Sequence, residues 1–270
     1  MKSIELKGGP HAVMALHGLL GNPLEMQYIG KQMQRAGYSV TIPLVPGYGY
    51  ATGQTSSLRT TRSEQWYEEV QRRFDALKRE HESVSVVGLC IGAVLALRLA
   101  SENPGEVAAL SLLATTLDYD GWSIPKYRFL LPLAYYTPAR YLYSYKERYP
   151  FGIKNEKLRK WIAREMETST SSAAGASRLS AEGIFQAHRL IQHVKRTLEN
   201  VCCPTLIMHA EEDDVATPKS ADLVESRISS PIKKKILLHD SYHIITLDNE
   251  KERVANETVN FFDQAVQSAH

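Results

Sequence analysis

The amino-acid sequence predicts an α/β fold: a mostly parallel central sheet with helices on both faces and one helical insertion. Short apolar segments alternate with amphipathic segments from residue 12 to residue 113, and again from residue 205 to residue 266. This alternation is typical of a parallel sheet that is covered by helices. Because it stops between the two stretches, we expect residues 1–117 and 201–270 to form the core and residues 118–200 to form a lid.

Length and composition are those of a globular protein that can bury a hydrophobic core. The chain has 270 residues, of which 43% are hydrophobic, and its net charge of +2 comes from scattered side chains. This distribution argues against a nucleic-acid partner or an anionic membrane surface. The N-terminus lacks the apolar segment of a secretion signal, and no apolar stretch is long enough for a membrane span, so we expect a cytoplasmic protein.

No cofactor or metal is expected. The sequence contains no glycine-rich phosphate loop, no dinucleotide-binding fingerprint and no set of His, Cys and Asp residues at metal-ligand spacing. Its three cysteines are too few for a disulfide framework. Cys202 and Cys203 precede an apolar strand, and we expect both to pack as small hydrophobic residues.

In the first part of the core, each segment has the pattern of a strand or a helix. Pro23 stands at the start of one amphipathic segment, where its missing N–H costs nothing, and Gly37 follows the end of that segment. In another segment, Trp66, Val70 and Phe74 recur at helical spacing. We expect strands at residues 12–16, 38–44, 84–87 and 107–113, and helices at residues 23–35, 62–81 and 91–100.

The insertion shows no clean strand pattern. Helices are expected at residues 157–167 and 181–198, separated by a Ser/Ala-rich linker at residues 169–177. We expect some of its many tyrosines to pack against the core and others to line a pocket. They are Tyr119, Tyr127, Tyr135, Tyr136, Tyr141, Tyr143, Tyr145 and Tyr149. After the insertion we expect strands at residues 205–209 and 233–239, and helices at residues 218–228 and 249–266.

A nucleophile elbow is predicted at Gly88-Leu89-Cys90-Ile91-Gly92, between an expected strand and an expected helix. In such an elbow, the sequence Gly-x-Ser-x-Gly places its central residue on a strained turn, and the flanking glycines permit close backbone approach. The positive end of the following helix favours a thiolate over a thiol. Cys90 is therefore the candidate nucleophile; the alternative is a buried structural cysteine between two packing glycines.

A nucleophile of this kind needs a base, and the base needs a carboxylate that orients it. After such an elbow, the acid comes first along the chain and the histidine second. His243 lies in the loop between the last expected strand and the last expected helix. The acid is expected in an earlier loop that contains Glu211, Glu212, Asp213 and Asp214. At most one of these four side chains can point at the imidazole.

The segment His17-Gly18-Leu19-Leu20-Gly21 follows the first strong strand. Its glycine allows a sharp turn that directs the amide of Leu19 toward the nucleophile. With the amide of Ile91 at the helix start, it would form an oxyanion hole, the element that we expect to give the largest electrostatic stabilisation. His17 is expected to be a structural histidine, hydrogen-bonded beneath the loop.

With these motifs the sequence resembles the bacterial carboxylesterase and monoacylglycerol-lipase branch of the α/β-hydrolases. The similarity covers nearly the whole chain apart from the insertion, with the motifs in the family's order. The matching segments are residues 17–26, 36–40, 44–49, 88–92, 210–218 with 220–221, and 241–248. The resemblance implies an α/β-hydrolase fold. It also selects Asp213 as the acid, because the family's aspartate lies two residues before the valine of that loop.

The sequence departs from the family pattern at three positions. Cys90 replaces the family's serine, Tyr48 replaces the histidine of a Gly-His-Gly segment, and Tyr242 replaces the glycine before the catalytic histidine. We expect Tyr48 and Tyr242 to contact the substrate. The sequence alone does not distinguish a native cysteine at position 90 from an engineered replacement of serine.

A covalent acyl intermediate on Cys90 leads to our first hypothesis, hydrolysis of small-molecule carboxylic esters or thioesters, carrier-bound thioesters included. The second hypothesis is an acyltransferase that moves an acyl group from a thioester to an alcohol or amine. It is motivated by Cys90, because a thioester can be discharged to water or to such an acceptor, and by Tyr48 and Tyr242, which replace smaller or basic residues of the family. A third hypothesis, a non-catalytic binding protein on the same fold, is disfavoured by the intact set of nucleophile, acid, histidine and glycines.

Overall fold

The computed structural model describes residues 2–19, 21–45, 47, 61–141, 144–146, 149–168, 171–172, 175–176 and 178–268. Its centre is a seven-stranded sheet in the order β1-β3-β2-β4-β5-β10-β11. Every neighbouring pair is parallel except β1 and β3, which are antiparallel. The strands are β1 (Ile4–Leu6), β2 (His11–Leu16), β3 (Ser39–Ile42), β4 (Ser83–Leu89), β5 (Leu110–Leu113), β10 (Thr205–Ala210) and β11 (Lys233–Leu238). The predicted fold class is confirmed.

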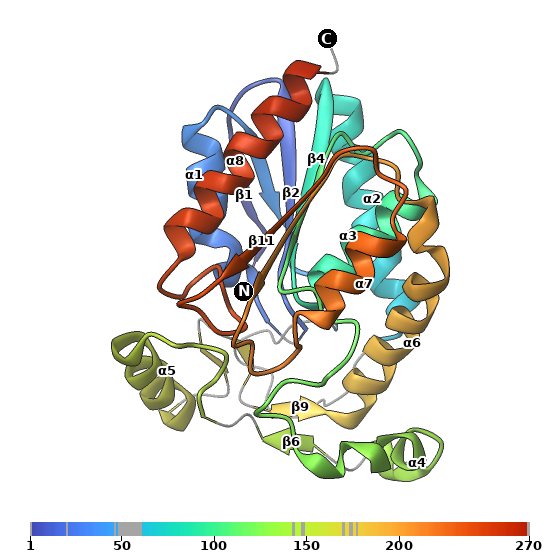
Figure 1. Cartoon of the computed structure of the whole chain (residues 1–270), viewed down its shortest axis with the longest axis vertical. Coiled ribbons are helices and arrows are strands. Elements are labelled where there is room, and N and C mark those ends of the chain that lie inside the picture. The colour runs from blue at the N-terminus through green and yellow to red at the C-terminus, as the bar shows by residue number, and fades with distance from the viewer. Residues whose placement is uncertain are drawn as a thin grey trace.

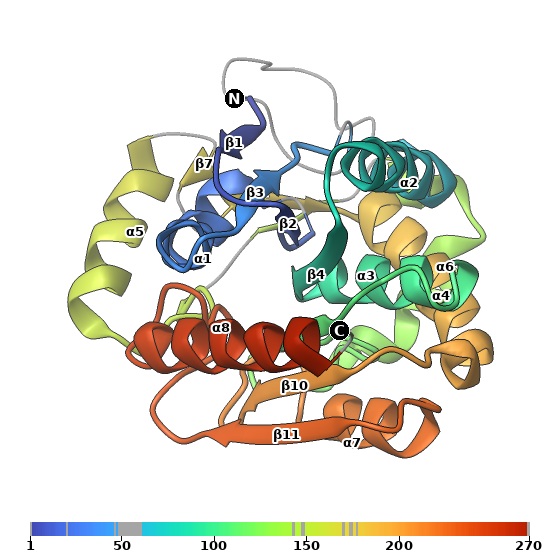
Figure 2. The same ribbon diagram turned by 90° about the horizontal axis from the view of Figure 1, so that it is seen from above.

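Helices cover both faces of the sheet (Figures 1 and 2). One face packs against α1 (Gln27–Arg35) and α8 (Lys251–Ser268). The other packs against α2 (Ser63–Glu80), α3 (Ile91–Glu102), α6 (Ala181–Thr197) and α7 (Lys219–Arg227). Each of these helices lies within a few residues of the range that the sequence predicts.

Alternation along the strands divides the core into two clusters. In β2, Met14 and Leu16 belong to the cluster beneath α2 and α3, whereas Val13 and Ala15 belong to the cluster beneath α1 and α8. Successive side chains of a strand point to opposite faces of its sheet, so an apolar run supplies both cores at once. This explains why the central strands read as continuous apolar segments rather than as alternating ones.

The edge strand β1 is absent from the sequence prediction, because three residues are too few to show a period. The structure also corrects the expectation that the insertion holds no strand. In its described residues, β6 (Ser144–Lys146) pairs with β9 (Arg178–Ser180), and β7 (Ser171–Ser172) pairs with β8 (Gly175–Ala176). These strands are two or three residues long, below the length at which hydrophobic alternation can be recognised.

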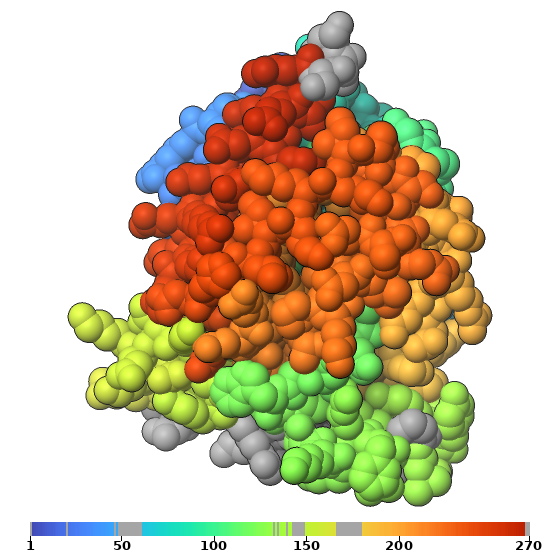
Figure 3. Space-filling view, in the orientation of Figure 1, coloured from blue at the N-terminus to red at the C-terminus, as the bar shows by residue number. Residues whose placement is uncertain are grey.

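Most of the segment between β5 and β10 lies at one end of the molecule, at the bottom of Figure 1, whereas its helix α6 runs along the side of the sheet. In the space-filling view, its green and yellow-green atoms spread across that end beneath the orange α7 and β11 region (Figure 3). Besides the four short strands and α6, it contains η2 (Lys126–Leu130), α4 (Leu131–Tyr135), η3 (Pro138–Tyr141), α5 (Glu156–Thr168) and η4 (Leu198–Asn200). Several of its apolar side chains are exposed, including Phe129, Leu133 and Tyr136.

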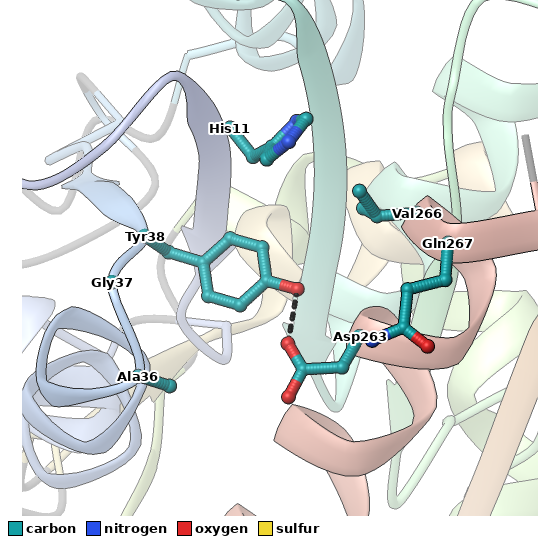
Figure 4. A pocket seen from close by; sticks show the side chains of 7 residues that line it. All are labelled: His11, Ala36, Gly37, Tyr38, Asp263, Val266 and Gln267. Carbon is teal, nitrogen blue, oxygen red and sulfur yellow. Dashed lines mark hydrogen bonds between the residues drawn. The ribbon is translucent and has the colours of Figure 1, made fainter. Parts of the chain in front are cut away.

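Figure 4 shows a small cavity at the opposite end of the sheet, where the parallel strands begin. It has a volume of about 140 Å³ and is lined in part by His11, Tyr38 and Asp263. The hydroxyl of Tyr38 donates to Oδ1 of Asp263 at 2.7 Å, which joins the start of β3 to α8. Because this cavity lies at the amino ends of the strands, it is not part of the site at their carboxyl ends.

Candidate active site

Cys90 occupies a strained turn between β4 and α3. Its backbone has φ 58° and ψ −118°, and it directly precedes the first residue of the helix. A residue other than glycine at positive φ costs about 1–3 kcal/mol and persists only where its surroundings hold it. Here the amide of Cys90 donates to the carbonyl oxygen of Leu113 at 2.9 Å, which ties the turn to β5.

The two glycines of the elbow are required by close backbone contacts. A Cβ atom on Gly88 would lie 2.4 Å from the carbonyl oxygen of Gly92, and one on Gly92 would lie 2.3 Å from that of Leu16. The first turn of α3 therefore rests on the ends of β4 and β2. This close approach is the physical reason for the Gly-x-Cys-x-Gly spacing in this chain.

His243 and Asp213 are brought together by the loops that follow β11 and β10. Nδ1 of His243 lies 2.9 Å from Oδ1 and 2.8 Å from Oδ2 of Asp213. Oδ1 of Asp213 also accepts hydrogen bonds from the amides of Val215 and Ala216, at 2.8 and 2.9 Å. Both side chains are buried. The carboxylate is therefore fixed by its own loop and holds one nitrogen of the imidazole.

The charges of this pair shift both pKa values. Burial opposes ionisation of Asp213, but the attraction of His243 and the hydrogen bonds from the histidines hold the pKa of Asp213 well below its usual range. Burial alone would lower the pKa of His243; the nearby Asp213 and Cys90 outweigh it and raise the pKa well above 6.5. His243 can therefore hold the proton that the thiol of Cys90 loses.

Nε2 of His243 is the nitrogen that remains for proton transfer. It is buried and forms no hydrogen bond with atoms of the residues that the structure describes. Cys90 nevertheless lies near enough to contribute to the electrostatics of the ring. Nε2 can therefore accept a proton from the thiol and deliver it to a leaving group.

Of the four acids in the loop after β10, Asp213 is the one whose carboxylate contacts the imidazole. Asp214 instead accepts from the backbone amide of His243, at 3.3 Å. Glu211 pairs with His239, and Glu212 pairs with Lys154. Of these four side chains, only Asp213 contacts the ring of His243; the other three contact backbone or surface groups.

The loop after β2 places Leu19 and Cys90 against the same apolar cluster. His17 is buried, and its Nδ1 lies 3.0 Å from the carbonyl oxygen of Gly18. Burial lowers the pKa of His17 to about 4, so the ring is neutral at physiological pH. Ile91 begins α3, and its amide is one of the four at a helix start that have no partner within the helix.

Glu25, which the sequence analysis missed, lies behind this loop. Oε2 of Glu25 accepts from the amide of Gly18 at 2.9 Å, and a Cβ atom on Gly21 would lie 2.2 Å from Oε1. Burial raises the pKa of Glu25 to about 7, although the Gly18 amide and His243 act in the opposite direction. The short helix that carries it, η1 (Pro23–Met26), is capped by Asn22, whose side chain accepts from the amide of Leu24.

The hydroxyl of Thr116, which the sequence analysis also missed, contacts the candidate nucleophile. Oγ1 of Thr116 lies 3.3 Å from Sγ of Cys90. Glu25 lies in the matched segment 17–26, but the segment gives no role for its side chain. Thr116 lies in none of the matched segments and reaches the site from the end of β5. Local sequence patterns carry no information about such contacts.

The two tyrosines that were expected to bind substrate have different outcomes. Tyr48 lies outside the described residues. The ring of Tyr242 packs edge-on against Trp122, with ring centres 5.3 Å apart, and Lys154 lies over its face. Tyr242 also lines a surface pocket of about 620 Å³ together with Lys154, Asp240 and residues of α5.

Asp248 joins the insertion to the histidine loop. Its buried carboxylate accepts from the amides of Tyr242, Lys154 and Asn155 at 2.7–2.8 Å. In addition, the amide of Ile244 donates to the carbonyl oxygen of Gly152 at 2.9 Å. The backbone on either side of His243 is therefore held by residues of the insertion.

The free cysteines differ in exposure. Cys203 is buried, as expected, and burial raises the pKa of its thiol to about 12. Cys202 is exposed, so the expectation that it packs in the core is wrong. No helix within the described ranges is long and apolar enough to cross a bilayer. Over the same ranges, no three His, Cys, Asp or Glu side chains form a group that could hold a metal ion.

Comparison with known proteins places the chain among the hydrolases. Residues 10–252 match the family model described as serine aminopeptidase, S33. The chain is 29% identical to a thermostable monoacylglycerol lipase of Bacillus sp. (strain H-257), over 95% of this chain and 92% of the relative. It is 25% identical to a carboxylesterase of Bacillus subtilis (strain 168), over 97% and 96% of the two chains. A solved structure of a metagenome-derived lipolytic enzyme superposes with a TM-score of 0.81 at 22% identity, covering 97% of both chains.

Proposed function

The chain belongs to the serine aminopeptidase S33 family of α/β-hydrolases, and from this we propose that it hydrolyses carboxylic esters through an acyl intermediate on Cys90. The main support for the proposal is the hydrogen-bonded pair of His243 and Asp213, with Nδ1 and Oδ2 2.8 Å apart. The imidazole of this pair interacts electrostatically with Cys90, which lies on a strained turn. A buried structural cysteine would not need an oriented imidazole. Both curated relatives, the lipase and the carboxylesterase, act on esters by name.

In the first half of the proposed reaction, His243 removes the thiol proton and Sγ of Cys90 attacks the ester carbonyl carbon. A C–S bond forms, and the carbonyl oxygen becomes an oxyanion. When the C–O bond breaks, His243 returns the proton to the departing alkoxide, which leaves as an alcohol. The product on the enzyme is a thioester of Cys90.

In the second half, water discharges the thioester. His243 takes a proton from the water molecule, whose oxygen attacks the thioester carbonyl. The C–S bond then breaks, the carboxylic acid leaves, and the proton returns to the sulfur. Asp213 keeps Nδ1 of the imidazole occupied throughout, so that Nε2 is the nitrogen that exchanges protons.

We assign the oxyanion hole to the amides of Leu19 and Ile91. Ile91 is the first residue of α3, where the helix leaves its amide without an internal partner. Leu19 packs in the same cluster as Cys90. Hydrogen-bond donors at this position stabilise the negative charge that develops on the carbonyl oxygen in both halves of the reaction.

We further propose that residues 118–200 act as a lid and that the substrate carries an apolar acyl chain. The segment connects to the histidine loop through Asp248, and it presents Phe129, Leu133 and Tyr136 to solvent. Tyr242, packed between Trp122 and Lys154, would contribute to the rim of the entrance. Tyr48 is proposed as a second substrate contact from its sequence position alone.

Acyl transfer is the second candidate, and the observation that favours it is the cysteine itself. A thioester on Cys90 can be discharged by an alcohol or amine as well as by water. The same site would also accept a thioester donor. Both functions share every step up to the acyl-enzyme and differ in the acceptor.

Product analysis separates these functions. Purified protein is incubated with nitrophenyl esters of increasing chain length and with an acyl thioester, with and without glycerol or a primary amine. We expect free acid in every case, at a rate that the acceptors leave unchanged. Ester or amide as the main product would establish acyl transfer instead. Loss of both products in Cys90→Ala confirms that the activity belongs to this site, whereas full activity in that variant would contradict the mechanism.

A further inference from the structure

We propose that Thr116 is a catalytic residue that donates a hydrogen bond to the thiolate of Cys90. The proposal rests on the proposed function, in which Cys90 is the nucleophile. Oγ1 of Thr116 lies 3.3 Å from Sγ of Cys90, within hydrogen-bond distance for sulfur, and the threonine is fully buried. The contact comes from the loop after β5, an element that supplies none of the other proposed catalytic groups.

The hydroxyl of Thr116 has one proton and two acceptors at equal distance. Sγ of Cys90 and the carbonyl oxygen of Ala114 both lie 3.3 Å from Oγ1. A thiol sulfur is a weak acceptor, whereas a thiolate is a strong one. The proton therefore belongs with the carbonyl while Cys90 is protonated and turns to the sulfur when the thiolate forms.

This difference makes the hydrogen bond selective for one state of the nucleophile. A group that interacts equally with thiol and thiolate changes nothing in their ratio, but a donor that binds the thiolate more strongly increases its population. Thr116 would complement the helix start of α3, which acts on the same sulfur. The buried position of Thr116 strengthens the effect, because water does not compete for its hydroxyl.

The backbone around Thr116 is held on both sides, so the hydroxyl cannot readily turn away. Ala114 has φ 45°, and its amide donates to the carbonyl oxygen of Met208 at 2.8 Å. The amide of Leu117 donates to Oγ of Ser220, on α7, at 3.2 Å. The loop is thus pinned to β10 before Thr116 and to α7 after it.

Three other titratable groups surround Cys90. His243 lies on the loop after β11, and Tyr119 follows Thr116 on the same loop. Glu25 lies across Gly18, where a Cβ atom would be 3.2 Å from Oε2 of Glu25 and 3.5 Å from Cβ of Cys90. Replacing Thr116 leaves all three in place, so a change in thiol reactivity in that variant reports on the hydroxyl.

The experiment measures the alkylation of Cys90 by iodoacetamide as a function of pH in the full-length protein, by peptide mass spectrometry. Exposed Cys202 serves as an internal reference in every sample. Thr116→Val keeps the shape of the side chain and removes the hydroxyl. We expect it to move the midpoint of Cys90 alkylation upward by about one pH unit and to lower kcat/KM near pH 7 about tenfold.

Two variants distinguish the hydroxyl from packing. Thr116→Ser keeps the donor and loses a methyl group, and we expect its alkylation profile to follow the wild type. Thr115→Val is the matched control: Thr115 is also fully buried, but its hydroxyl has no hydrogen-bond partner among the described residues. We expect no shift in the Cys90 profile for that variant.

A second arm repeats Thr116→Val in a Cys90→Ser background. A serine hydroxyl loses its proton as it attacks and does not accumulate as an anion. Thr116→Val should therefore reduce kcat/KM less in the Cys90→Ser protein than in the protein with Cys90. Unchanged Cys90 alkylation and kcat/KM in Thr116→Val would overturn the inference while leaving the proposed function intact. If Cys90 of the wild type is never acylated by substrate, the proposed function itself fails, and the Thr116 inference fails with it.

Discussion

The carboxylate of Asp213 lies 2.8 Å from Nδ1 of His243, although the two residues are separated by 30 positions in sequence and by the whole of β11. Their contact depends on the parallel arrangement of β10 and β11, whose carboxyl ends meet at one edge of the sheet. The same arrangement brings the end of β4, with Cys90, to that edge. Parallel strand order is therefore what assembles the proposed catalytic groups.

Asp213→Asn tests the identity of the acid. The side-chain amide of the new asparagine cannot stabilise a protonated imidazole of His243 or fix its tautomer, so we expect kcat to fall about 10³- to 10⁴-fold. Asp214→Asn is the matched control, because that side chain accepts from the backbone amide of His243 rather than from its ring. We expect it to retain activity within about tenfold. Steady-state kinetics on one ester decides, and a larger loss in Asp214→Asn would contradict the assignment.

Gly92→Ala tests the packing of the elbow. The added methyl group would lie 2.3 Å from the carbonyl oxygen of Leu16, so α3 must move away from β2. We expect a loss of about 2–3 kcal/mol in the free energy of unfolding and near-complete loss of activity. Gly105→Ala is a suitable control: it has φ +79° but open space around it, and should cost about 1 kcal/mol with normal activity. Denaturant titration and an ester assay measure both effects.

Glu25 makes the stability of the fold depend on pH. Its pKa is raised from 4.5 to about 7 by burial, so between these values the unfolded chain has lost the proton while the folded protein keeps it. The unfolded state binds fewer protons in this window, and stability therefore falls as pH rises through it and levels off above about pH 7.

In Glu25→Gln this contribution disappears, because the amide does not ionise. We expect the variant to gain up to about 3 kcal/mol over the wild type on going from pH 4 to pH 8. Urea unfolding at a series of pH values measures the difference between the two proteins, which removes the contributions of other groups. A difference that is the same at both ends of the range would show that Glu25 is not buried as described.

Asp248→Ala tests the connection between the insertion and the histidine loop. The substitution leaves the partly buried amides of Tyr242, Lys154 and Asn155 without their acceptor. We expect about 3 kcal/mol of destabilisation, and a lower kcat because the position of His243 is less well defined. Asp240→Ala, on the exposed side of the same loop, should leave both quantities nearly unchanged. Equal effects of the two substitutions would contradict the inference that Asp248 connects the insertion to the histidine loop.

Much of the fold could be predicted from the sequence because the sheet and its helices are long enough to show their periods. Trp66, Val70 and Phe74 mark α2 at helical spacing, and all three are buried. The edge strand β1 and the short pairs of the insertion lack a recognisable period, because each has only two or three residues. Their position depends on the partner strand rather than on their own composition.

The proposed catalytic residues could be predicted where a loop motif follows a strand, as at Cys90, Asp213 and His243. The choice between Asp213 and Asp214 rested on family resemblance, since adjacent carboxylates cannot be distinguished by spacing. Glu25 and Thr116 were missed for other reasons. Thr116 reaches Cys90 from the end of another strand, a contact that exists only once the parallel sheet has formed. Glu25 bonds to Gly18 within one loop, but its sequence pattern does not reveal that its carboxyl group is buried.

Intact-protein mass spectrometry shows directly whether Cys90 carries the acyl group. The protein is mixed with an excess of an activated ester and quenched in acid within the first turnover. We expect a mass increase equal to one acyl group, localised to the Cys90 peptide. The adduct should be longer-lived in His243→Ala once formed, and absent in Cys90→Ala. An acyl group on any other residue, or the same adduct in Cys90→Ala, would contradict the proposal that Cys90 is the nucleophile.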